Sequence, residues 1–286
     1  LRSEKDKWRD FWQQEAKSYY FIGKDNIPFH TMVWPAMLMG YGGLNLPYDV
    51  PANEFLTLEG RQLSTSRNWA VWLPDYLERY APDPLRYLLS VNMPETGDTD
   101  FSWREFARRN NDELVATYGN LVHRVLTFTY RHFDGCVPIP SELDGVSKAL
   151  LHTAESTFNS VDNFLYRCHF REGIKAAMSL AQETNRYLEE KSPWKVIKRD
   201  REACAIALFV SLSVISYLKS LLYPFLPFSS QKLHHLLGFE GMVNEERWGV
   251  HPLPPGQRLA PPEPLFTKLD EEMVTGETSR LGHTPD

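Results

Sequence analysis

Cysteine is scarce in this sequence, with only three among 286 residues. Cys136, Cys168 and Cys204 are widely separated, and no two of them form a Cys-x-x-Cys pair. This spacing excludes a disulfide framework and a zinc knuckle, so we expect no metal site in this chain. Unpaired cysteines of this kind are typical of a reducing compartment, and we expect a cytoplasmic protein.

The sequence also lacks a secretory signal. It opens on LRSEKDKWRDFWQQ, which has neither an apolar core nor a small-residue cleavage site, and it does not begin with methionine. The most apolar segment, residues 203–228, is interrupted by serines, Lys219 and Pro224. We therefore expect a buried bundle helix in this segment and not a membrane span.

Composition indicates a globular chain, and its uneven charge leaves a polyanionic partner open. At 42% hydrophobic residues the chain is large enough for about two domains with real cores. The formal net charge is −6, but residues 103–109 and 195–201 are locally basic. Because local patches outweigh net charge when the partner is a polyanion, nucleic acid is not excluded.

The first sixty residues alternate helix and strand patterns. Periodicity predicts helices at about 3–17 and 29–39 and strands at 19–23 and 50–56. This is the pattern of a βαβ unit in a parallel sheet. Two strands would leave the sheet incomplete, so we expect half of an α/β domain.

The remainder of the chain reads as helices. Ser102 is a predicted N-cap with Glu105 three residues later. After Gly238 the chain becomes rich in proline, which predicts an extended strap with a disordered end. The helices are expected to form an antiparallel bundle and lie at 74–80, 83–93, 103–132, 142–168, 171–191, 194–223 with a break near Asp200, and 225–237.

The turn after the first strand is a candidate ligand site. Gly23, Lys24 and Asp25 end a strand that leads into a helix, and open α/β folds bind ligands at this edge of the sheet. Asp25 is suited to accept a hydrogen bond from a ribose hydroxyl. Lys24 is suited to a phosphate or to pairing with Asp25.

An aromatic group follows on the next helix. His30 and Trp34 are four residues apart and share one helix face, with Phe29 beside them. Aromatic walls suit a small apolar ligand, and a thioether would gain sulfur–aromatic contacts. The alternative is that these three residues are core side chains under the sheet.

The stretch GRQLSTSRNW, residues 60–69, is a second candidate site. Ser64, Thr65 and Ser66 offer hydroxyl donors, and Arg61 and Arg67 offer positive charge, which suits a triphosphate or a leaving pyrophosphate. We expect the loop to follow a strand of the same sheet and to face the same ligand. The alternative is a polar surface hairpin.

In the bundle, Asn120 and Arg124 are an i,i+4 pair of the types that read base edges. Trp194 follows the helix-starting Pro193 beside a basic run, and its indole suits stacking on unstacked RNA bases. The alternative is that Asn120 and Arg124 are solvated helix surface and that Trp194 fills a bundle corner.

Six motifs in order resemble the class I methionyl-tRNA synthetases, from the second half of their catalytic domain through the anticodon-binding helix bundle. The match covers about residues 8 to 270. It is carried by FIGKDNIPFHTMVWPAML, by FLTLEGRQLSTSRN in the place of the KMSKS loop, by DPLRYLL, by GNLVHR, by SPW and by the closing PLFTKLD.

The resemblance implies methionine–tRNA ligase activity, in which ATP with Mg²⁺ activates methionine and the methionyl group passes to tRNA. Four parts are implied: 1–73 as the second half of a Rossmann-like catalytic domain with the KMSKS-type loop at 60–68, 74–101 as connecting helices, 102–237 as the anticodon-binding bundle, and 238–286 as a strap and tail. Residue roles are implied as follows: catalysis by Arg61, Ser64, Thr65, Ser66 and Arg67; ATP binding by Gly23, Lys24 and Asp25; methionine binding by Phe29, His30 and Trp34; anticodon binding by Asn120, Arg124, Pro193 and Trp194.

Two departures from the family pattern matter. Gln62, Leu63 and Thr65 replace Lys, Met and Lys of KMSKS, so either the flanking arginines supply the lost charge or the loop has lost activation. No His-x-Gly-His motif is present. We therefore expect a C-terminal fragment that binds tRNA but needs the missing half, in cis or in trans, to catalyse.

Two other functions remain open: a noncatalytic tRNA-binding module, and a sibling class I synthetase for another apolar amino acid. We expect a monomer.

Overall fold

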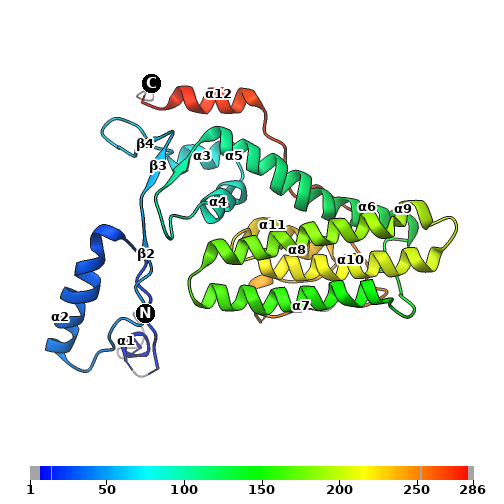
Figure 1. The fold of residues 1–286 in the computed structure, drawn as a ribbon, viewed down its shortest axis with the longest axis horizontal. Coiled ribbons are helices and arrows are strands. Elements are labelled where there is room, and N and C mark those ends of the chain that lie inside the picture. The colour runs from blue at the N-terminus through cyan, green and yellow to red at the C-terminus, as the bar shows by residue number, and fades with distance from the viewer. Residues whose placement is uncertain (1–6, 14, 246, 252, 283–286) are drawn as a thin grey trace. The chain divides into compact units, whose positions relative to one another are not determined.

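The computed structural model describes residues 7–13, 15–245, 247–251 and 253–282. The chain divides into two compact units (Figure 1). The first is formed by Leu1–Leu63 with Met93–Asp100, and the second by Ser64–Asn92 with Phe101–Asp286. The first unit contains the short strands, and the second contains the long helices.

The first unit contains the predicted βαβ arrangement. Strand β1 (Ile22–Gly23) pairs in parallel with β2 (Ala52–Asn53), with Ile22 opposite Ala52. The connection contains a 3₁₀ turn, η1 (Lys24–Asn26), then one π-helical segment, η2 (Phe29–Val33), and helix α2 (Trp34–Tyr41). The predicted parallel pairing is confirmed, although both strands are shorter than expected.

The predicted strand at 50–56 is divided between two sheets. Its second part is β3 (Leu56–Leu58), which pairs antiparallel with β4 (Arg61–Gln62), and β5 (Thr99–Phe101) flanks β3 on the other side. Between β2 and β3 the amide of Glu54 donates to the carbonyl of Pro94 at 2.7 Å. At this point the chain pairs with the segment before β5 and no longer with β1. The segment between the predicted helices at 83–93 and 103–132 therefore contains a strand.

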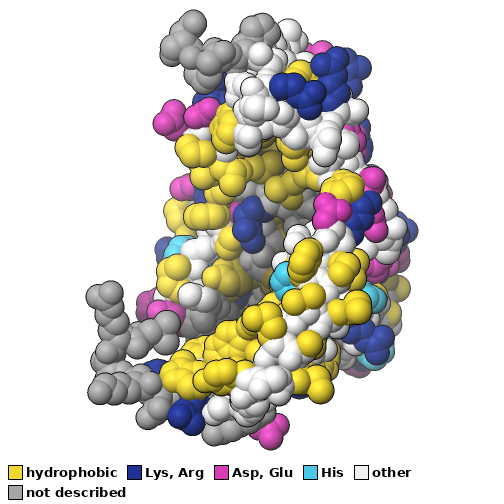
Figure 2. Space-filling view, turned by 90° about the vertical axis from the view of Figure 1, so that its left-hand side faces the viewer, with side chains coloured by type: hydrophobic (Ala, Val, Ile, Leu, Met, Phe, Trp, Pro, Cys, Tyr) yellow, Lys and Arg dark blue, Asp and Glu magenta, His cyan; other side chains and the backbone are white. Residues whose placement is uncertain are grey.

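The predicted helix at 3–17 is only one turn long within the described residues, α1 (Arg9–Trp12). Helix α2 presents an exposed apolar surface: Met37 is 59% exposed, Met39 is 70% exposed, and Tyr41 is 77% exposed. Figure 2 shows hydrophobic side chains gathered on the face where α2 lies. An apolar surface of this kind is typical of a contact with another protein segment.

The second unit begins with α3 (Leu73–Arg79) and α4 (Pro82–Val91), close to their predicted positions. The predicted long helix follows without a break as α5 (Trp103–Arg109), a π-helical segment η3 (Asn110–Gly119) and α6 (Asn120–His132). Ser102 accepts a hydrogen bond from the amide of Glu105, so the predicted N-cap is confirmed.

The bundle proper is built from α6 and the five helices that follow it, and α6, α7, α8 and α10 lie side by side (Figure 1). The predicted break near Asp200 is confirmed, because the Asp200 carboxylate caps a new helix by accepting from the amide of Ala203 at 2.8 Å. The helices are α7 (Gly145–Tyr166), α8 (Phe170–Lys191), α9 (Pro193–Val196), α10 (Arg201–Leu222) and α11 (Pro227–Leu236).

Helix α10 is the predicted buried bundle helix. Among the described residues it is the one helix long and apolar enough to cross a membrane, and 83% of its most apolar window is buried inside the bundle. It packs against α6, α7, α8 and α11. Its hydropathy is therefore accounted for by protein contacts.

The strap runs along the bundle, as predicted, held by backbone hydrogen bonds such as Val137 to the carbonyl of Gln257 at 2.9 Å. The end of the chain is not disordered throughout as expected, because residues 271–280 form helix α12 (Glu271–Arg280), which packs against α5. Arg79 and Tyr80 both donate to Glu277, whose side chain is 5% exposed. This tertiary ion pair stabilises a helix that composition alone does not indicate.

The Asp144 side chain has two roles at the start of α7. It accepts from the amide of Ser147 at 2.8 Å, which caps the helix, and from Lys191 Nζ at 2.7 Å. The Lys191 ammonium, with the Ser147 amide, lowers the pKa of the Asp144 carboxyl to about 2. A carboxyl with a lowered pKa contributes stability above its unfolded pKa and loses it as the pH falls.

We predict that Asp144→Asn lowers the free energy of unfolding by about 0.5–1 kcal/mol at pH 7, because asparagine keeps the cap but loses the partly exposed ion pair. The difference from the wild-type chain should shrink as the pH falls from about 4 towards 2. Urea unfolding followed by circular dichroism at several pH values measures this difference. Glu142→Gln, at a carboxylate that is 93% exposed, is the control and should have little effect. A difference that stays constant down to pH 2 would contradict the assignment.

Candidate functional site

The candidate nucleotide turn is formed by η1 directly after β1. Gly23 has open space around its Cα, because no heavy atom lies within 4 Å of the Cβ that another residue would add. Asp25 is exposed and Lys24 is half-buried. The backbone geometry thus leaves the edge of the strand accessible to a ligand, as the sequence predicts.

The Lys24 ammonium is held by two acidic side chains. It pairs with Glu54 and, at 3.2 Å, with Asp98, and it lies 4.3 Å from the centre of the Phe55 ring. The hydrogen bond that Lys24 donates to Glu54, together with the one to Asp98, raises the pKa of Lys24. The structure therefore places Lys24 with Glu54 and Asp98 and not with Asp25, the pairing considered from the sequence.

The predicted aromatic group is assembled around Tyr20. The indole Nε1 of Trp34 donates to the Tyr20 hydroxyl at 3.0 Å, and the rings of Tyr20 and His30 lie 5.8 Å apart. Trp12 meets Trp34 edge-on at 6.0 Å, while Phe29 is 59% exposed. His30 and Trp34 are thus brought together, whereas Phe29 is open to solvent.

The loop at residues 60–69 begins as a hairpin. The turn between β3 and β4 is held by Asp100, whose Oδ1 accepts from the Gly60 amide at 2.8 Å. The prediction that this loop follows a strand of the same sheet as β1 is wrong, because β3 and β4 belong to the second sheet. Gly60 has φ 71°, a conformation that glycine adopts without strain.

The serine-rich part of the loop is closed by a pair of backbone hydrogen bonds between Ser64 and Trp69, at 2.9 and 2.8 Å. Inside this closure the Ser64 and Ser66 hydroxyls lie 3.3 Å apart. Asn68 takes a left-handed conformation, φ 50°, and its Oδ1 accepts from Trp72 Nε1 at 2.6 Å. The two hydroxyls therefore lie in a turn of defined shape.

The charged residues of the loop are open to solvent. Arg61, Thr65, Ser66 and Arg67 are all exposed, which leaves them accessible to an anionic ligand. Arg61 belongs to the first compact unit and Arg67 to the second. The hydroxyl and guanidinium groups suit phosphate oxygens, which accept charge-assisted hydrogen bonds.

In the bundle, Arg124 and Trp194 are brought into contact. The guanidinium carbon of Arg124 lies 4.4 Å from the centre of the Trp194 ring, a cation–π arrangement. Asn120 and Arg124 are both exposed on α6, one turn apart. The half-buried indole also packs against the hydrophobic core, so it both fills a bundle corner and supports an exposed arginine.

The backbone around Trp194 is held in place by its neighbours in sequence. Ser192 ends α8 in a left-handed conformation, φ 43°, and its hydroxyl donates to the Glu189 carbonyl at 2.7 Å. Pro193 is buried and is the first residue of α9. The chain therefore turns sharply between α8 and α9 and presents Trp194 beside α6.

Sequence reasoning missed the residues that hold the candidate sites together. Tyr20 could have been found as a second aromatic residue in the first strand pattern. Asn68 could also have been found, because asparagine is enriched in left-handed turns. Asp98 and Asp100 act across 43 and 40 residues, and no local pattern signals such contacts.

No group of three or more metal-binding side chains is present in the part of the chain that the structure describes. The sites therefore offer hydrogen bonding, aromatic contact and positive charge. This chemistry suits the binding of phosphates, apolar side chains and unstacked bases.

Two protein-family profiles match consecutive parts of this chain. The family described as tRNA synthetases class I (M) matches residues 1–126, and the anticodon binding domain of methionyl tRNA ligase matches residues 137–285. Together they span both compact units.

Curated relatives agree with these profiles. A methionine–tRNA ligase of Dehalococcoides mccartyi is 56% identical over 281 residues, which cover 98% of this chain and 51% of the relative. A methionine–tRNA ligase of Roseiflexus castenholzii is 48% identical, with 96% of this chain and 52% of the relative covered. The chain thus spans about half the length of the curated relatives it matches.

Solved structures give the same result. The free form of Mycobacterium tuberculosis methionyl-tRNA synthetase matches 92% of this chain and 51% of its own, with a TM-score of 0.81 and 29% identity. The same enzyme bound by methionyl-adenylate matches 91% of this chain and 51% of its own, with a TM-score of 0.82 and 29% identity. The predicted fold, part of a class I synthetase catalytic domain followed by a helical anticodon-binding domain, is confirmed. The chain belongs to the class I methionyl-tRNA synthetase family.

Proposed function

We propose that this chain takes part in methionine–tRNA ligation, in which ATP activates methionine to an adenylate and the methionyl group then passes to tRNA. The observation that carries the proposal is the Arg124–Trp194 stack at an exposed corner of the bundle. Trp194 lies in the region matched by the anticodon-binding profile, residues 137–285, and Arg124 lies at the end of the region matched by the catalytic profile, residues 1–126.

The first compact unit contributes to ATP and methionine binding. The open strand edge at Gly23 suits close approach of a nucleotide. The side chain of Asp25 is exposed and can accept a hydrogen bond from a ribose hydroxyl. The Tyr20, His30 and Trp34 cluster suits the thioether of methionine. Mg²⁺ accompanies the triphosphate as part of the substrate, and no zinc is required of this chain.

The Lys24 ion pairs bear on how the phosphates are held. An ammonium that already pairs with Glu54 and Asp98 must exchange partners before it binds a phosphate. The charge for the triphosphate therefore comes from the exposed arginines of the loop, Arg61 and Arg67. Ser64 and Ser66 add hydroxyl donors from their defined turn.

The chain acts together with the rest of the catalytic domain, supplied in cis or in trans. A two-stranded parallel sheet is marginal by itself, and the exposed methionines of α2 suit burial against another segment. The relatives are about twice as long, which supports this arrangement. We further propose four parts, 1–73, 74–101, 102–237 and 238–286, in a cytoplasmic monomer.

A noncatalytic tRNA-binding module is the second candidate function. The observation that favours it is the loop, in which no lysine stands between Gly60 and Trp69. Adenylate formation and tRNA binding are therefore tested separately.

We predict that Trp194→Ala and Arg124→Ala each weaken binding of a methionine-accepting tRNA by about tenfold or more. A stacked aromatic contributes about 1–3 kcal/mol per base, and removal of either partner disrupts the stack. Fluorescence anisotropy with labelled tRNA at fixed salt measures the affinity.

Arg167→Ala is the matched control, because it removes an exposed guanidinium from the turn between α7 and the start of α8. That helix has 22 residues, so Arg167 lies about 33 Å from the Trp194 end. The control should change affinity by less than threefold. Equal binding of all tRNAs, or equal losses in the control and the two variants, would remove the anticodon assignment.

We predict that Arg61→Ala combined with Arg67→Ala lowers adenylate formation at least tenfold in the complete protein. The reason is that the lost charge-assisted hydrogen bonds no longer stabilise the negative charge that grows on the leaving pyrophosphate. Methionine-dependent ATP–pyrophosphate exchange is the measurement. Arg186→Ala, at a side chain that is 74% exposed on the bundle, serves as the control.

The two candidate functions give opposite results in this assay. Exchange by the unaltered complete protein, with a loss in the double variant and none in the control, supports activation by the arginine loop. Absence of exchange by the complete protein, with tRNA binding retained, supports the noncatalytic module. Exchange that the double variant leaves unchanged shows that the loop arginines do not serve the phosphates.

A further inference from the structure

The serine-rich turn of the loop, residues 64–69, is contacted by a segment from the opposite end of the sequence. The amide of Gly282, two residues after α12, donates to the carbonyl of Asn68 at 3.0 Å. A Cβ added at Gly282 would lie 3.5 Å from Cε3 of the Trp69 ring, so the backbone there lies close to the indole. The segment after α12 therefore contacts the turn that carries the two serine hydroxyls.

The backbone conformation of Asn68 makes this contact important. Its φ of 50° is left-handed, which a residue other than glycine adopts at a cost and keeps only where its surroundings fix it. Trp72 Nε1 donates to the Asn68 side chain at 2.6 Å, and the Gly282 amide donates to its carbonyl. Of these two contacts, only that of Gly282 comes from a distant part of the sequence. The shape of the turn thus depends on where α12 ends.

Helix α12 is anchored to α3, the helix that follows the turn. Arg79 donates to the Glu277 carboxylate through Nε at 2.9 Å and through Nη2 at 3.0 Å. The Tyr80 hydroxyl donates to the same carboxylate at 2.9 Å. Because Glu277 is 5% exposed and accepts three hydrogen bonds from α3 and its C-cap, it fixes the position of α12 relative to α3.

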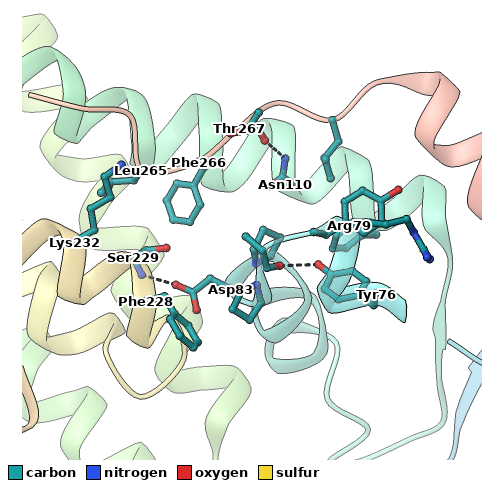
Figure 3. A pocket seen from close by; sticks show the side chains of 16 residues that line it. Tyr76, Arg79, Asp83, Asn110, Phe228, Ser229, Lys232, Leu265, Phe266 and Thr267 are labelled. Atoms are coloured by element: carbon teal, nitrogen blue, oxygen red, sulfur yellow. Dashed lines mark hydrogen bonds between the residues drawn. The ribbon is translucent and has the colours of Figure 1, made fainter. Parts of the chain in front are cut away.

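The segment that leads into α12 is anchored as well. Asn110 Nδ2 donates to the carbonyl of Thr267 at 2.9 Å (Figure 3). Asn111 exchanges two hydrogen bonds with the backbone of Leu269: its Nδ2 donates to the carbonyl at 2.7 Å, and its Oδ1 accepts from the amide at 2.9 Å. Helix α12 is therefore fixed at its start and not only at its two later contacts.

A role of α12 in stability alone explains the Glu277 pair but not the path of the chain at Gly282. The Glu277 pair and the packing of α12 on α5 would hold the helix without any contact to the loop. Gly282 has φ 79°, which brings its amide to the Asn68 carbonyl. Glycine adopts this conformation without strain, whereas other residues do not.

We propose that Glu277 and Gly282 are positioning residues for the loop, through which α12 holds the Ser64 and Ser66 hydroxyls where phosphate binding requires them. This inference rests on the proposed ligase function, in which these hydroxyls serve the triphosphate. Both residues act through the turn and not on the substrate: Glu277 fixes α12, and Gly282 fixes Asn68. Misplacement of a binding group by about 1 Å can lower a rate about a hundredfold, so a helix outside the site can control the reaction.

The first test measures the turn alone, by limited trypsin digestion of the 286-residue chain followed by mass spectrometry. Trypsin cleaves after Arg67, inside the turn, and after Arg61, in the β3–β4 hairpin; both residues are exposed. We expect Glu277→Gln and Gly282→Ala each to raise the rate of cleavage after Arg67 at least about fivefold and to leave cleavage after Arg61 unchanged. Glutamine cannot accept the two-pronged pair, and alanine disfavours the left-handed conformation.

Two substitutions on α12 are the matched controls. Glu272→Gln removes an exposed carboxylate from the same helix, and Gly276→Ala adds a methyl group where no heavy atom lies within 4 Å. Neither should change the rate of cleavage after Arg67.

Each outcome of the digestion decides the assignment. Unchanged cleavage after Arg67 in either variant would overturn the role of the residue that was changed. An equal rise after Arg61 and Arg67 would mean general loosening of the chain and would overturn the proposal. Circular dichroism shows whether each variant is folded, and Gly282→Ala decides if Glu277→Gln is not.

The second test measures the reaction, by methionine-dependent ATP–pyrophosphate exchange in the complete protein. We expect Glu277→Gln to lower kcat/KM for ATP at least about tenfold and to change the KM for methionine less than about threefold, because the loop serves the phosphates. An unchanged kcat/KM for ATP, or an equally large effect on the KM for methionine, would overturn the positioning role in the reaction. Absence of exchange by the unaltered protein would remove the ligase function, and the trypsin comparison would still decide whether α12 holds the turn.

Discussion

Burial of α10 is the constraint on which the helical unit depends. From Ser211 to Ser216 every side chain of this helix is buried, so the helix is apolar on all sides and needs neighbours around its whole circumference. Ser211 and Ser213 donate to carbonyls one turn earlier in the same helix, and Ser216 donates to the His251 carbonyl. Lys219 is fully buried and meets His234 Nδ1 at 3.2 Å. A polar pair of this kind limits how α11 can pack on α10.

The packing of these helices determines where the candidate anticodon residues lie. Because α8 and α10 both lie in the core, the chain between them has to reverse within a few residues. The left-handed Ser192 and the Asp200 cap fix the two ends of that reversal. Trp194 lies between them with one part of its ring in the core, and the Arg124 guanidinium lies over the ring. The proposed recognition surface is thus positioned by the core packing of α8 and α10 and by the caps of the turn between them.

The sequence predicted those features of the fold that local physics decides. The caps at Ser102 and Asp200, and the helices they begin, follow from periodicity and side-chain chemistry within a few residues. Contacts distant in sequence decided the rest. The Glu54 amide meets Pro94 and splits a predicted strand, and Glu277 meets Arg79 and stabilises a helix where disorder was expected. Such pairings, 40 and 198 residues apart, leave no trace in a local pattern.

The same distinction applies to the candidate sites. Sequence spacing brought His30 and Trp34 to one helix face, and the structure adds Tyr20, which joins them through a hydrogen bond and a ring contact. Lys24 looked like a phosphate ligand from its position after a strand, yet its ammonium is paired with Glu54 and Asp98. A cation between two carboxylates is a structural group as much as a ligand group, since any phosphate must compete with both. Lys24 can therefore bind a phosphate only if it gives up one of these pairs, and for this reason we assigned the charge for the triphosphate, as a proposal, to the exposed arginines of the loop.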